Sequence, residues 1–403
     1  MGHYIVNIIF DTFQAALFIT AMFYLGVSVF SLFPFKYKKP EDEYKKFIVI
    51  IPAHNEESVI ESVILSLKQQ NYPKELVKVF VMADFCTDFT EKKAYECGAS
   101  VLLRKTDERT KGAALYDAFR QILDLNLDFD SVVIVDADNI VDVDFLSEIN
   151  FMMQQGHSVV QGYVDSLNPN ESWVAYAYSM WYWITNRITQ TGFSRLSLNC
   201  KINGTGFAVA KNVLGSILMK SNSLAEDTEY TVRLELESCR IAFAPKAVVY
   251  DKKPESFNVS IRQRKRWAKG NIDVLRKYFL KLIKNKRISD LLSLISDFMI
   301  PICWIFFLIV DFTVILDLTG IIRNNMFLLW SNTINLFLLN VYVFGMLLSV
   351  CCGLLIDKKL NTKFMLNIFG FIIYILSWIP ITISGLFSFN DRSWYHTGHK
   401  KNR

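Results

Sequence analysis

Long uncharged stretches lie at both ends of the chain, and a more polar region separates them. Residues 12–35 contain no charged side chain, and roughly 20 apolar residues suffice to cross the roughly 30 Å core of a bilayer. Further apolar stretches follow the polar region at residues 298–322, 326–356 and 364–390. The pattern predicts an N-terminal transmembrane helix within residues 1–36 and a C-terminal transmembrane region over residues 291–390.

The first apolar stretch is followed, not preceded, by basic residues. These are Lys36, Lys38, Lys39, Lys45 and Lys46. Basic residues are retained on the cytoplasmic side of a membrane, so we expect the polar region to be cytosolic. The stretch also lacks the basic flank and small-residue cleavage site of a signal peptide, which favours a permanent anchor.

The polar region alternates short β-branched runs with amphipathic stretches. The runs at residues 47–52, 77–83, 99–103 and 131–138 predict strands, and residues 56–70, 87–97 and 111–125 have helical spacing. This alternation is typical of an open α/β sheet. It predicts a cytosolic α/β domain over residues 45–255.

A strongly basic segment links this domain to the C-terminal apolar stretches. Residues 262–287 contain eleven Lys or Arg and one acid, and apolar residues recur within them at helical spacing. We expect basic amphipathic interface helices over residues 256–290, lying on an anionic inner leaflet. Nucleic-acid binding is the competing use of such charge, but the apolar stretches that follow favour lipid.

Composition narrows the function classes further. The chain is 52% hydrophobic and 21% charged, which excludes a disordered protein. Its seven cysteines form no CxxC pair and its five histidines show no ligand spacing, so we expect no disulfide framework and no zinc or iron site. GxGxxG and GxxxxGK[ST] are both missing, so neither a dinucleotide nor a P-loop phosphate cradle is present.

Polar residues follow three of the predicted strands, where ligands of open α/β sheets bind. They occupy residues 52–56, 83–88 and 136–139. Asp136 and Asp138 leave a buried strand on the same side and offer hard oxygen donors, which suit Mg²⁺ or Mn²⁺.

The chain resembles the membrane-integrated family 2 glycosyltransferases with a GT-A fold, the group that contains cellulose, chitin, hyaluronan and poly-N-acetylglucosamine synthases. The resemblance covers residues 47–270 and depends on the order of five short motifs. These are Pro52-Ala53-His54-Asn55-Glu56, Asp84 with Asp88, Asp136-Ala137-Asp138, Glu226-Asp227 and Gln263-Arg264-Lys265-Arg266-Trp267. It implies a Rossmann-like mixed sheet and a hexosyltransferase that uses a UDP-sugar.

The resemblance also implies roles at the donor site. Asp138 binds the metal, and Asp136 contributes to the metal and nucleotide site. The other nucleotide-sugar contacts are Ala53, Glu56, Asp84, Lys111, Gln263 and Arg266. For Asp84 an Asx-turn or helix cap is the alternative, and Lys111, which precedes a helix, is otherwise an ordinary exposed lysine.

Asp227 is the candidate general base. Glycosyl transfer needs a deprotonated acceptor hydroxyl, and the resemblance assigns that step to Asp227. Acids are also favoured in a first helical turn by the helix dipole alone. With one base and no carboxylate nucleophile, the expected chemistry is direct displacement with inversion.

The expected acceptor contacts are Trp267, Glu226, Gly204 and Thr205. The resemblance places Trp267 under the acceptor sugar, although an interfacial anchor is the alternative. The aromatic-rich residues 173–183 are expected to fill the core more readily than to bind sugar.

The C-terminal tail, residues 391–403, resembles the short loop that covers the nucleotide sugar in these synthases. That role requires a cytosolic C-terminus. Pro380 and Gly385 interrupt the last apolar stretch, so we expect a re-entrant segment there.

The sequence therefore predicts a multi-pass plasma-membrane enzyme that transfers glucose or N-acetylglucosamine from its UDP-sugar, with Mg²⁺ or Mn²⁺, to a growing β-linked polysaccharide and exports it. The expected partners are the donor, a glycan acceptor and the lipid bilayer, with no nucleic acid. One alternative is a non-processive enzyme that adds one sugar to a lipid-linked acceptor. Another is a transporter or sugar-binding protein without turnover. The sequence leaves the oligomeric state and the donor sugar open.

Overall fold

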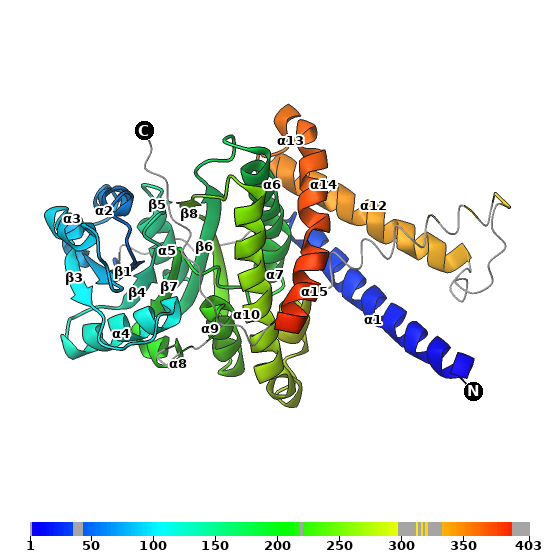
Figure 1. The fold of residues 1–403 in the computed structure, drawn as a ribbon, viewed down its shortest axis with the longest axis horizontal. Coiled ribbons are helices and arrows are strands. Elements are labelled where there is room, and N and C mark those ends of the chain that lie inside the picture. Colours follow the sequence, from blue (N-terminus) through cyan, green and yellow to red (C-terminus); the bar gives the residue numbers. More distant parts are fainter. Residues whose placement is uncertain are drawn as a thin grey trace.

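The computed structural model describes residues 2–34, 43–217, 221, 223–296, 312, 316, 319–320 and 333–388. Its centre is a mixed sheet with the strand order β3-β2-β1-β4-β7-β6-β8-β5 (Figure 1). The first four strands are parallel, and β7 runs antiparallel to both β4 and β6. The strands are β1 (Phe47–Ala53), β2 (Val77–Ala83), β3 (Ser100–Leu103), β4 (Ser131–Ile134), β5 (Ile140–Val141), β6 (Val159–Ser166), β7 (Phe207–Ala210) and β8 (Ile241–Asp251).

Helices pack on both faces of the sheet. The helices of the sheet region are α2 (Ile60–Lys68), α3 (Thr90–Glu96), α4 (Lys111–Asp124), α5 (Phe145–Gln154), α8 (Leu214–Ile217) and α9 (Glu226–Leu236). In β1, Val49 and Ile51 enter the core that contains α2 and α5, whereas Ile48 and Ile50 enter the core that contains α4. Alternate side chains of a strand face opposite ways, so β1 is apolar throughout because both of its faces are buried.

The predicted strands and helices of the first half are confirmed, with shifted ends. The strand over residues 131–138 ends at Ile134, so Asp136 and Asp138 lie in the turn that follows β4. The helix predicted from residue 56 begins at Ile60. The mixed α/β sheet is as expected.

The aromatic run folds as α6 (Trp173–Ile184) and continues into the π-helix η2 (Thr185–Thr191). Tyr176 and Tyr178 are buried, as the core interpretation predicts. Trp181 and Tyr182, in contrast, line the large cavity described below. The run therefore serves both the core and the cavity.

Two apolar helices project together from the body of the molecule (Figure 1). They are α1 (Gly2–Phe30) and α12 (Thr333–Ile356), and they pack through Ala21, Tyr342 and Met346. Arg187 holds the bases of both helices, because it pairs with Asp357 and donates a 3.3 Å hydrogen bond to the Ser31 carbonyl.

The last helices lie against α6 and α10 (Phe257–Lys284). They are α13 (Thr362–Leu366), α14 (Ile368–Leu376) and α15 (Trp378–Ser388), and α14 packs on α6 while α15 packs on α10. The helical run breaks at Ser377, and Pro380 stands in the first turn of α15, where proline is tolerated. Gly385 does not interrupt α15. A Cβ there would come within 3.2 Å of Ala268 and Ile272, so this glycine permits close packing on α10.

Arg264 of α10 contacts the residues at the break between α14 and α15. Its side chain is fully buried and donates hydrogen bonds to the Tyr374 carbonyl (3.0 Å) and to Ser377 Oγ (2.8 Å), and its guanidinium lies over the Tyr374 ring. A buried guanidinium is costly unless bonded, so this contact fixes α14 and α15 relative to α10.

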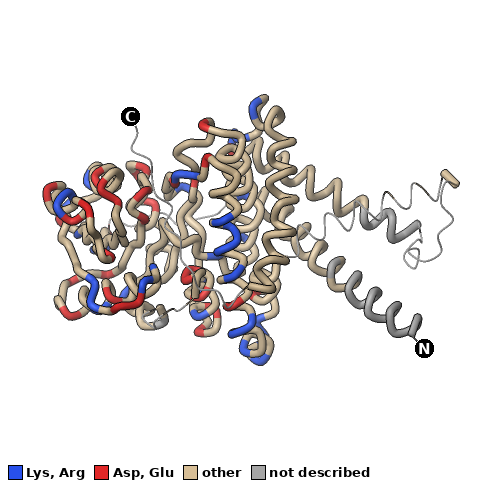
Figure 2. Tube along the Cα trace, viewed as in Figure 1, with Lys and Arg blue, Asp and Glu red and all other residues tan. Residues whose placement is uncertain are grey.

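The basic segment forms most of α10, and blue in Figure 2 marks the Lys and Arg positions along that helix. Its apolar residues divide between two environments. Ile272 and Leu282 are buried in the protein, whereas Phe279 and Ile283 remain 38% and 42% exposed. The expected lipid-facing stripe is therefore partly an internal packing face.

Among the described residues, one helical run, Ile368–Ser388, is long and apolar enough to cross a membrane by length and composition. Phe18–Phe30 and Asn340–Ile356 are shorter apolar helices. The tail at residues 391–403, the basic residues Lys36, Lys38 and Lys39, and nearly all of residues 298–332 lie outside the described residues, so the predictions made for them stay predictions.

Candidate active site

A cavity of about 1500 Å³ opens beyond the carboxyl ends of β1, β2 and β4. Every site residue predicted from the sequence lines it. These residues are Ala53, Glu56, Asp84, Lys111, Asp136, Asp138, Gly204, Thr205, Glu226, Asp227, Gln263, Arg266 and Trp267. The strand-end rule and the motifs thus converge on one place.

Asp84 forms the end of the cavity nearest β1 and β2. Its backbone N–H donates to the Ala53 carbonyl (2.8 Å), and its carboxylate forms a 3.2 Å ion pair with the buried Arg104. Burial raises the pKa of Asp84, and Arg104 opposes that rise. An Asx-turn contact is made by Asp88, whose side chain accepts from the backbone N–H of Thr90 (3.0 Å) at the start of α3.

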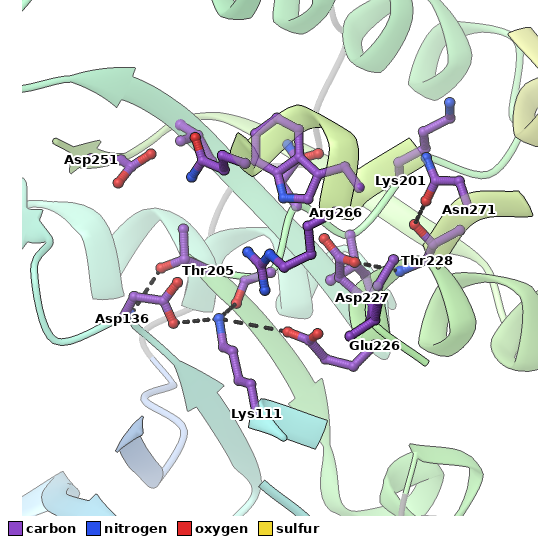
Figure 3. Close-up of a pocket in the computed structure, with 18 of the residues that line it drawn as sticks. Lys111, Asp136, Lys201, Thr205, Glu226, Asp227, Thr228, Asp251, Arg266 and Asn271 are labelled. Atoms are coloured by element: carbon purple, nitrogen blue, oxygen red, sulfur yellow. Dashed lines mark hydrogen bonds and ion pairs between the residues drawn. The ribbon is translucent and has the colours of Figure 1, made fainter. Parts of the chain in front are cut away.

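Lys111 is not an ordinary exposed lysine. Its Nζ donates to Asp136 Oδ1 (2.5 Å) and to the Gly204 carbonyl (2.9 Å), and lies 3.8 Å from Glu226 Oε1 (Figure 3). Burial lowers the pKa of Lys111, but Asp136, Glu226 and Asp227 together raise it above its usual value. A fixed ammonium therefore stands between the carboxylates.

Two further carboxylates, Asp138 and Asp251, lie near Asp136. Asn139 Nδ2 connects these two, since it donates to Asp138 Oδ1 (3.0 Å) and Asp251 Oδ1 (3.2 Å). Burial raises the pKa of Asp136 to about 6, with Lys111 opposing and Asp138 adding to the rise. A divalent cation offsets such mutual repulsion, and oxygen donors suit Mg²⁺ or Mn²⁺.

In the described part of the chain, no group of three or more His, Cys, Asp or Glu side chains is placed to hold a metal ion. A Mg²⁺-type site built on one or two carboxylates would be completed by water and substrate phosphates. Thr205 supports the turn, because its Oγ1 donates to Asn139 Oδ1 (2.5 Å) and accepts from the Asp136 N–H (3.0 Å). The predicted acceptor contact at Thr205 stays a prediction.

Asp227 stands in the first turn of α9, in the middle of the cavity (Figure 3). Burial raises its pKa to about 7, Glu226 adds to the rise, and the Thr228 N–H, Lys111 and Arg266 oppose it. Gly204, at φ +78°, brings its backbone beside the carboxylate, and a Cβ there would lie 3.4 Å from Asp227 Oδ2. A carboxylate with a pKa near neutrality is suited to proton transfer.

Helix α10 forms the opposite wall with Gln263, Arg266 and Trp267. Gln263 Oε1 accepts a 2.7 Å hydrogen bond from the Tyr178 hydroxyl, and the Trp267 ring meets Tyr178 edge-on at 6.0 Å. Arg266 points into the cavity between Asp136 and Asp227 (Figure 3). The motif therefore supplies a cation and an aromatic face to one cavity.

Two contacts lock α10 to the start of α9. Thr228 Oγ1 donates to Asn271 Oδ1 (2.7 Å), and Gly270 lies so close to Ala225 that a Cβ would meet the Ala225 backbone nitrogen at 2.6 Å. The position of Asp227 thus depends on the packing of these helices.

The family model described as glycosyltransferase-like family 2 matches residues 45–270. The chain belongs to this family. As a family 2 glycosyltransferase it has the enzyme class and the GT-A-like mixed α/β fold that the sequence predicts.

Alignments of this family 2 glycosyltransferase with its relatives extend beyond residues 45–270. The probable glycosyltransferase YdaM of Bacillus subtilis (strain 168) is 26% identical over 379 residues, covering 87% of this chain and 84% of that protein. The poly-β-1,6-N-acetyl-D-glucosamine synthase of Staphylococcus epidermidis is 23% identical over 350 residues, covering 85% and 81%. The solved mannosyltransferase PcManGT of Pyrobaculum calidifontis, in complex with GDP-Man and Mn²⁺, shares the fold with a TM-score of 0.55 at 17% identity, covering 84% and 97%.

Sequence reasoning missed several cavity residues of this family 2 glycosyltransferase. Asp251 lines the cavity and ends β8, so the strand-end rule, applied to every strand, finds it. The same rule finds Arg104, which directly follows β3 and pairs with the cavity residue Asp84. Lys201, Glu235 and Asp290 also line the cavity, but no motif or strand end marks them. Helix packing alone brings these three together.

Proposed function

We propose that this glycosyltransferase transfers glucose or N-acetylglucosamine from its UDP-sugar to a growing β-linked glycan, with inversion and with Mg²⁺ or Mn²⁺. The observation that carries the proposal is the position of Asp227, a carboxylate with a raised pKa between a cation-binding end and an aromatic wall. Such a group can take the acceptor proton while the other end holds the donor.

The donor occupies the strand-end side of the cavity. Asp84, with Ala53 and Glu56 beside it, contacts the nucleoside, and Lys111 and Arg266 neutralise the diphosphate. Asp138 and Asp136, supported by Asp251, hold the divalent ion. That ion supplies charge neutralisation to the leaving diphosphate.

The transfer is a single displacement. Asp227 accepts the proton of the acceptor hydroxyl while the hydroxyl oxygen forms a bond to the anomeric carbon of the donor. The bond between that carbon and the UDP oxygen breaks on the opposite face. UDP leaves with the bonding electron pair. One attack from the opposite face converts an α-linked donor into a β-glycoside, and no second carboxylate is needed.

Two features support polymer synthesis at the inner face of the plasma membrane. A poly-β-1,6-N-acetyl-D-glucosamine synthase is among the relatives and aligns over 85% of this chain. The apolar helices α1 and α12 project from the body and offer membrane anchors for a multi-pass enzyme. In this proposal the catalytic domain is cytosolic and the enzyme exports its product across the membrane. The tail at residues 391–403 completes this proposal as a loop over the donor.

The experiment is a donor panel on the purified full chain in detergent, with Mg²⁺, Mn²⁺ or EDTA. We expect UDP release and radiolabelled product from UDP-glucose or UDP-N-acetylglucosamine but not from UDP-glucuronate, and loss of both UDP release and product in EDTA. A ladder or high polymer supports elongation. A single sugar added to a lipid-linked acceptor would instead indicate a non-processive enzyme. If no donor gives UDP release, the proposal is refuted.

Trp267 tests elongation separately. An aromatic face stacks on a sugar without fixing its hydroxyls, which holds a chain yet lets it advance. Trp267→Ala should therefore shorten the product more than it slows UDP release. Trp173→Ala is the matched control, because Trp173 is 41% exposed and lies outside the cavity. Unchanged product length in Trp267→Ala makes Trp267 an interfacial anchor.

A further inference from the structure

Tyr178 of α6 lies behind the wall that α10 gives to the cavity. Its side chain is 1% exposed and is not part of the cavity lining. It nevertheless contacts two residues that do line the cavity, because its hydroxyl donates to Gln263 Oε1 (2.7 Å) and its ring meets the Trp267 ring edge-on at 6.0 Å. Gln263 and Trp267 are four residues apart and so share one face of α10. One buried side chain therefore touches both a proposed donor contact and a proposed acceptor contact.

The ring of Tyr178 is also held by aromatic side chains on its other sides. It stacks on Tyr182 at 6.3 Å and meets Tyr374 of α14 at 5.1 Å, with the two rings inclined by 62°. Aromatic pairs at such distances attract each other, and a ring that is packed against several of them has little freedom to turn. The hydroxyl is therefore presented to Gln263 in a fixed position.

The Tyr178 hydroxyl keeps its proton at neutral pH. Burial raises the pKa of this hydroxyl well above its usual value, Tyr374 and Tyr182 add to the rise, and Arg264 opposes it. A buried hydroxyl without a partner is costly, so its hydrogen bond to Gln263 Oε1 is favoured. Tyr178 therefore acts toward Gln263 as a permanent donor.

The direction of this hydrogen bond decides which end of the Gln263 amide faces the cavity. A glutamine amide has an oxygen that accepts hydrogen bonds and a nitrogen that donates two. The Tyr178 hydroxyl binds the oxygen, and no residue in the described part of the chain bonds the nitrogen, Nε2. A diphosphate can only accept hydrogen bonds, so Nε2 is the end that can bind it. The reversed amide would turn its oxygen toward negative charge.

We propose that Tyr178 is a positioning residue for donor binding, which holds the Gln263 amide with its nitrogen toward the diphosphate of the nucleotide sugar. The inference rests on the proposed function and deepens it, because it adds a residue outside the cavity to the donor site. The two parts of the side chain act separately: the hydroxyl orients Gln263, and the ring supports Trp267. Loss of the hydroxyl alone should therefore weaken donor binding without shortening the product.

The test removes the hydroxyl and keeps the ring. In the purified full chain, Tyr178→Phe should raise the Kd of UDP, measured by calorimetry with Mn²⁺, about three- to tenfold, the loss expected for one hydrogen bond. The KM of the UDP-sugar should rise to the same extent, while kcat and product length stay as in wild type. Tyr176→Phe is the matched control, because it removes the hydroxyl of another buried tyrosine of α6 and should leave UDP binding unchanged.

A double-mutant cycle separates positioning from packing. If Tyr178 acts through Gln263, the step from Tyr to Phe should have little effect on the Kd of UDP in a Gln263→Ala background. Equal losses in both backgrounds would mean that the hydroxyl only stabilises the fold, and they would overturn the inference. An unchanged Kd in the single variant Tyr178→Phe would overturn it as well.

Gln263→Glu gives a second measurement, which does not depend on the folding of a Tyr178 variant. This change replaces Nε2 by an oxygen of nearly the same position, so a carboxylate would face the diphosphate. UDP binding at pH 8 should therefore be weaker in Gln263→Glu than in Gln263→Ala. If Gln263→Glu bound UDP as tightly as wild type, the nitrogen would not face the diphosphate and the inference would fail.

UDP release distinguishes this inference from the proposed function. A wild type that binds UDP but releases none from any UDP-sugar refutes the proposed function, while the binding cycle still tests Tyr178. An active enzyme with an additive cycle refutes the inference alone. A wild type that neither binds nor releases UDP refutes both.

Discussion

The proposed donor end and the proposed acceptor end of the cavity are built by different means. Proposed donor residues such as Asp84 and Asp136 lie in the turns that follow strands, and hydrogen bonds fix these turns. The acceptor end is a set of helix faces, from α9, α10 and η2, whose residues come from distant parts of the chain. Residues at strand ends occur in short sequence motifs and can be recognised from them. Residues that only helix packing brings together, such as Glu235, belong to no such motif.

Asp227 stands where the two ends meet, and its loss should have the largest effect. Asp227→Asn keeps the shape but cannot accept a proton, so kcat should fall by about 10² to 10⁴-fold, the usual worth of a general base. UDP affinity, measured by calorimetry with Mn²⁺, should change little. Glu237→Gln is the matched control, because Glu237 is exposed and directly follows α9. A rate within threefold of wild type for Asp227→Asn would remove Asp227 from the mechanism.

Replacing Asp138, the proposed metal ligand, tests the proposed donor end alone. Asp138→Ala should weaken UDP binding about a hundredfold with Mg²⁺ or Mn²⁺, because metal neutralisation of the diphosphate is worth several kcal/mol. The same variant should bind UDP like wild type in EDTA, since the carboxylate acts through the ion. An equal loss in both conditions points to misfolding and contradicts the assignment.

The sequence identifies the residues that line the strand-end side of the cavity because the information is local. A strand buried on both faces, such as β1, needs a continuous apolar run, and the polar residues after it mark the site. Lys201, Glu235 and Asp290 escape prediction because they depend on how α9, η2 and residues 288–296 pack. The sequence likewise predicts the basic helix α10, but not that Ile272 and Leu282 are buried inside the protein.

The pH dependence of the transfer rate tests Asp227, which lies where the two ends of the cavity meet. Burial raises the pKa of Asp227 to about 7, and only the deprotonated form accepts a proton. The transfer rate should therefore rise about tenfold per pH unit below that pKa and level off above it. Initial rates from pH 5 to pH 9 with saturating donor give the profile. The inflection should vanish in the residual activity of Asp227→Asn, and a wild-type profile flat across this range would contradict the assignment.

The smallest effect is expected from the helix packing that holds the acceptor wall. Gly270→Ala places a Cβ 2.6 Å from the Ala225 backbone nitrogen, so α10 and the first turn of α9 must separate. Overpacking of this kind typically costs about 1–3 kcal/mol. A small displacement of Asp227 from the donor should also lower kcat several-fold. UDP affinity should fall less, because α10 contributes to the proposed donor site only through Gln263 and Arg266. Gly215→Ala in α8 is the matched control, because nothing lies within 4 Å of its new Cβ. Urea unfolding and initial rates measure both effects. If Gly270→Ala weakened UDP binding as much as it slowed transfer, the donor end would depend on helix packing as well, and the contrast between the two ends would fail.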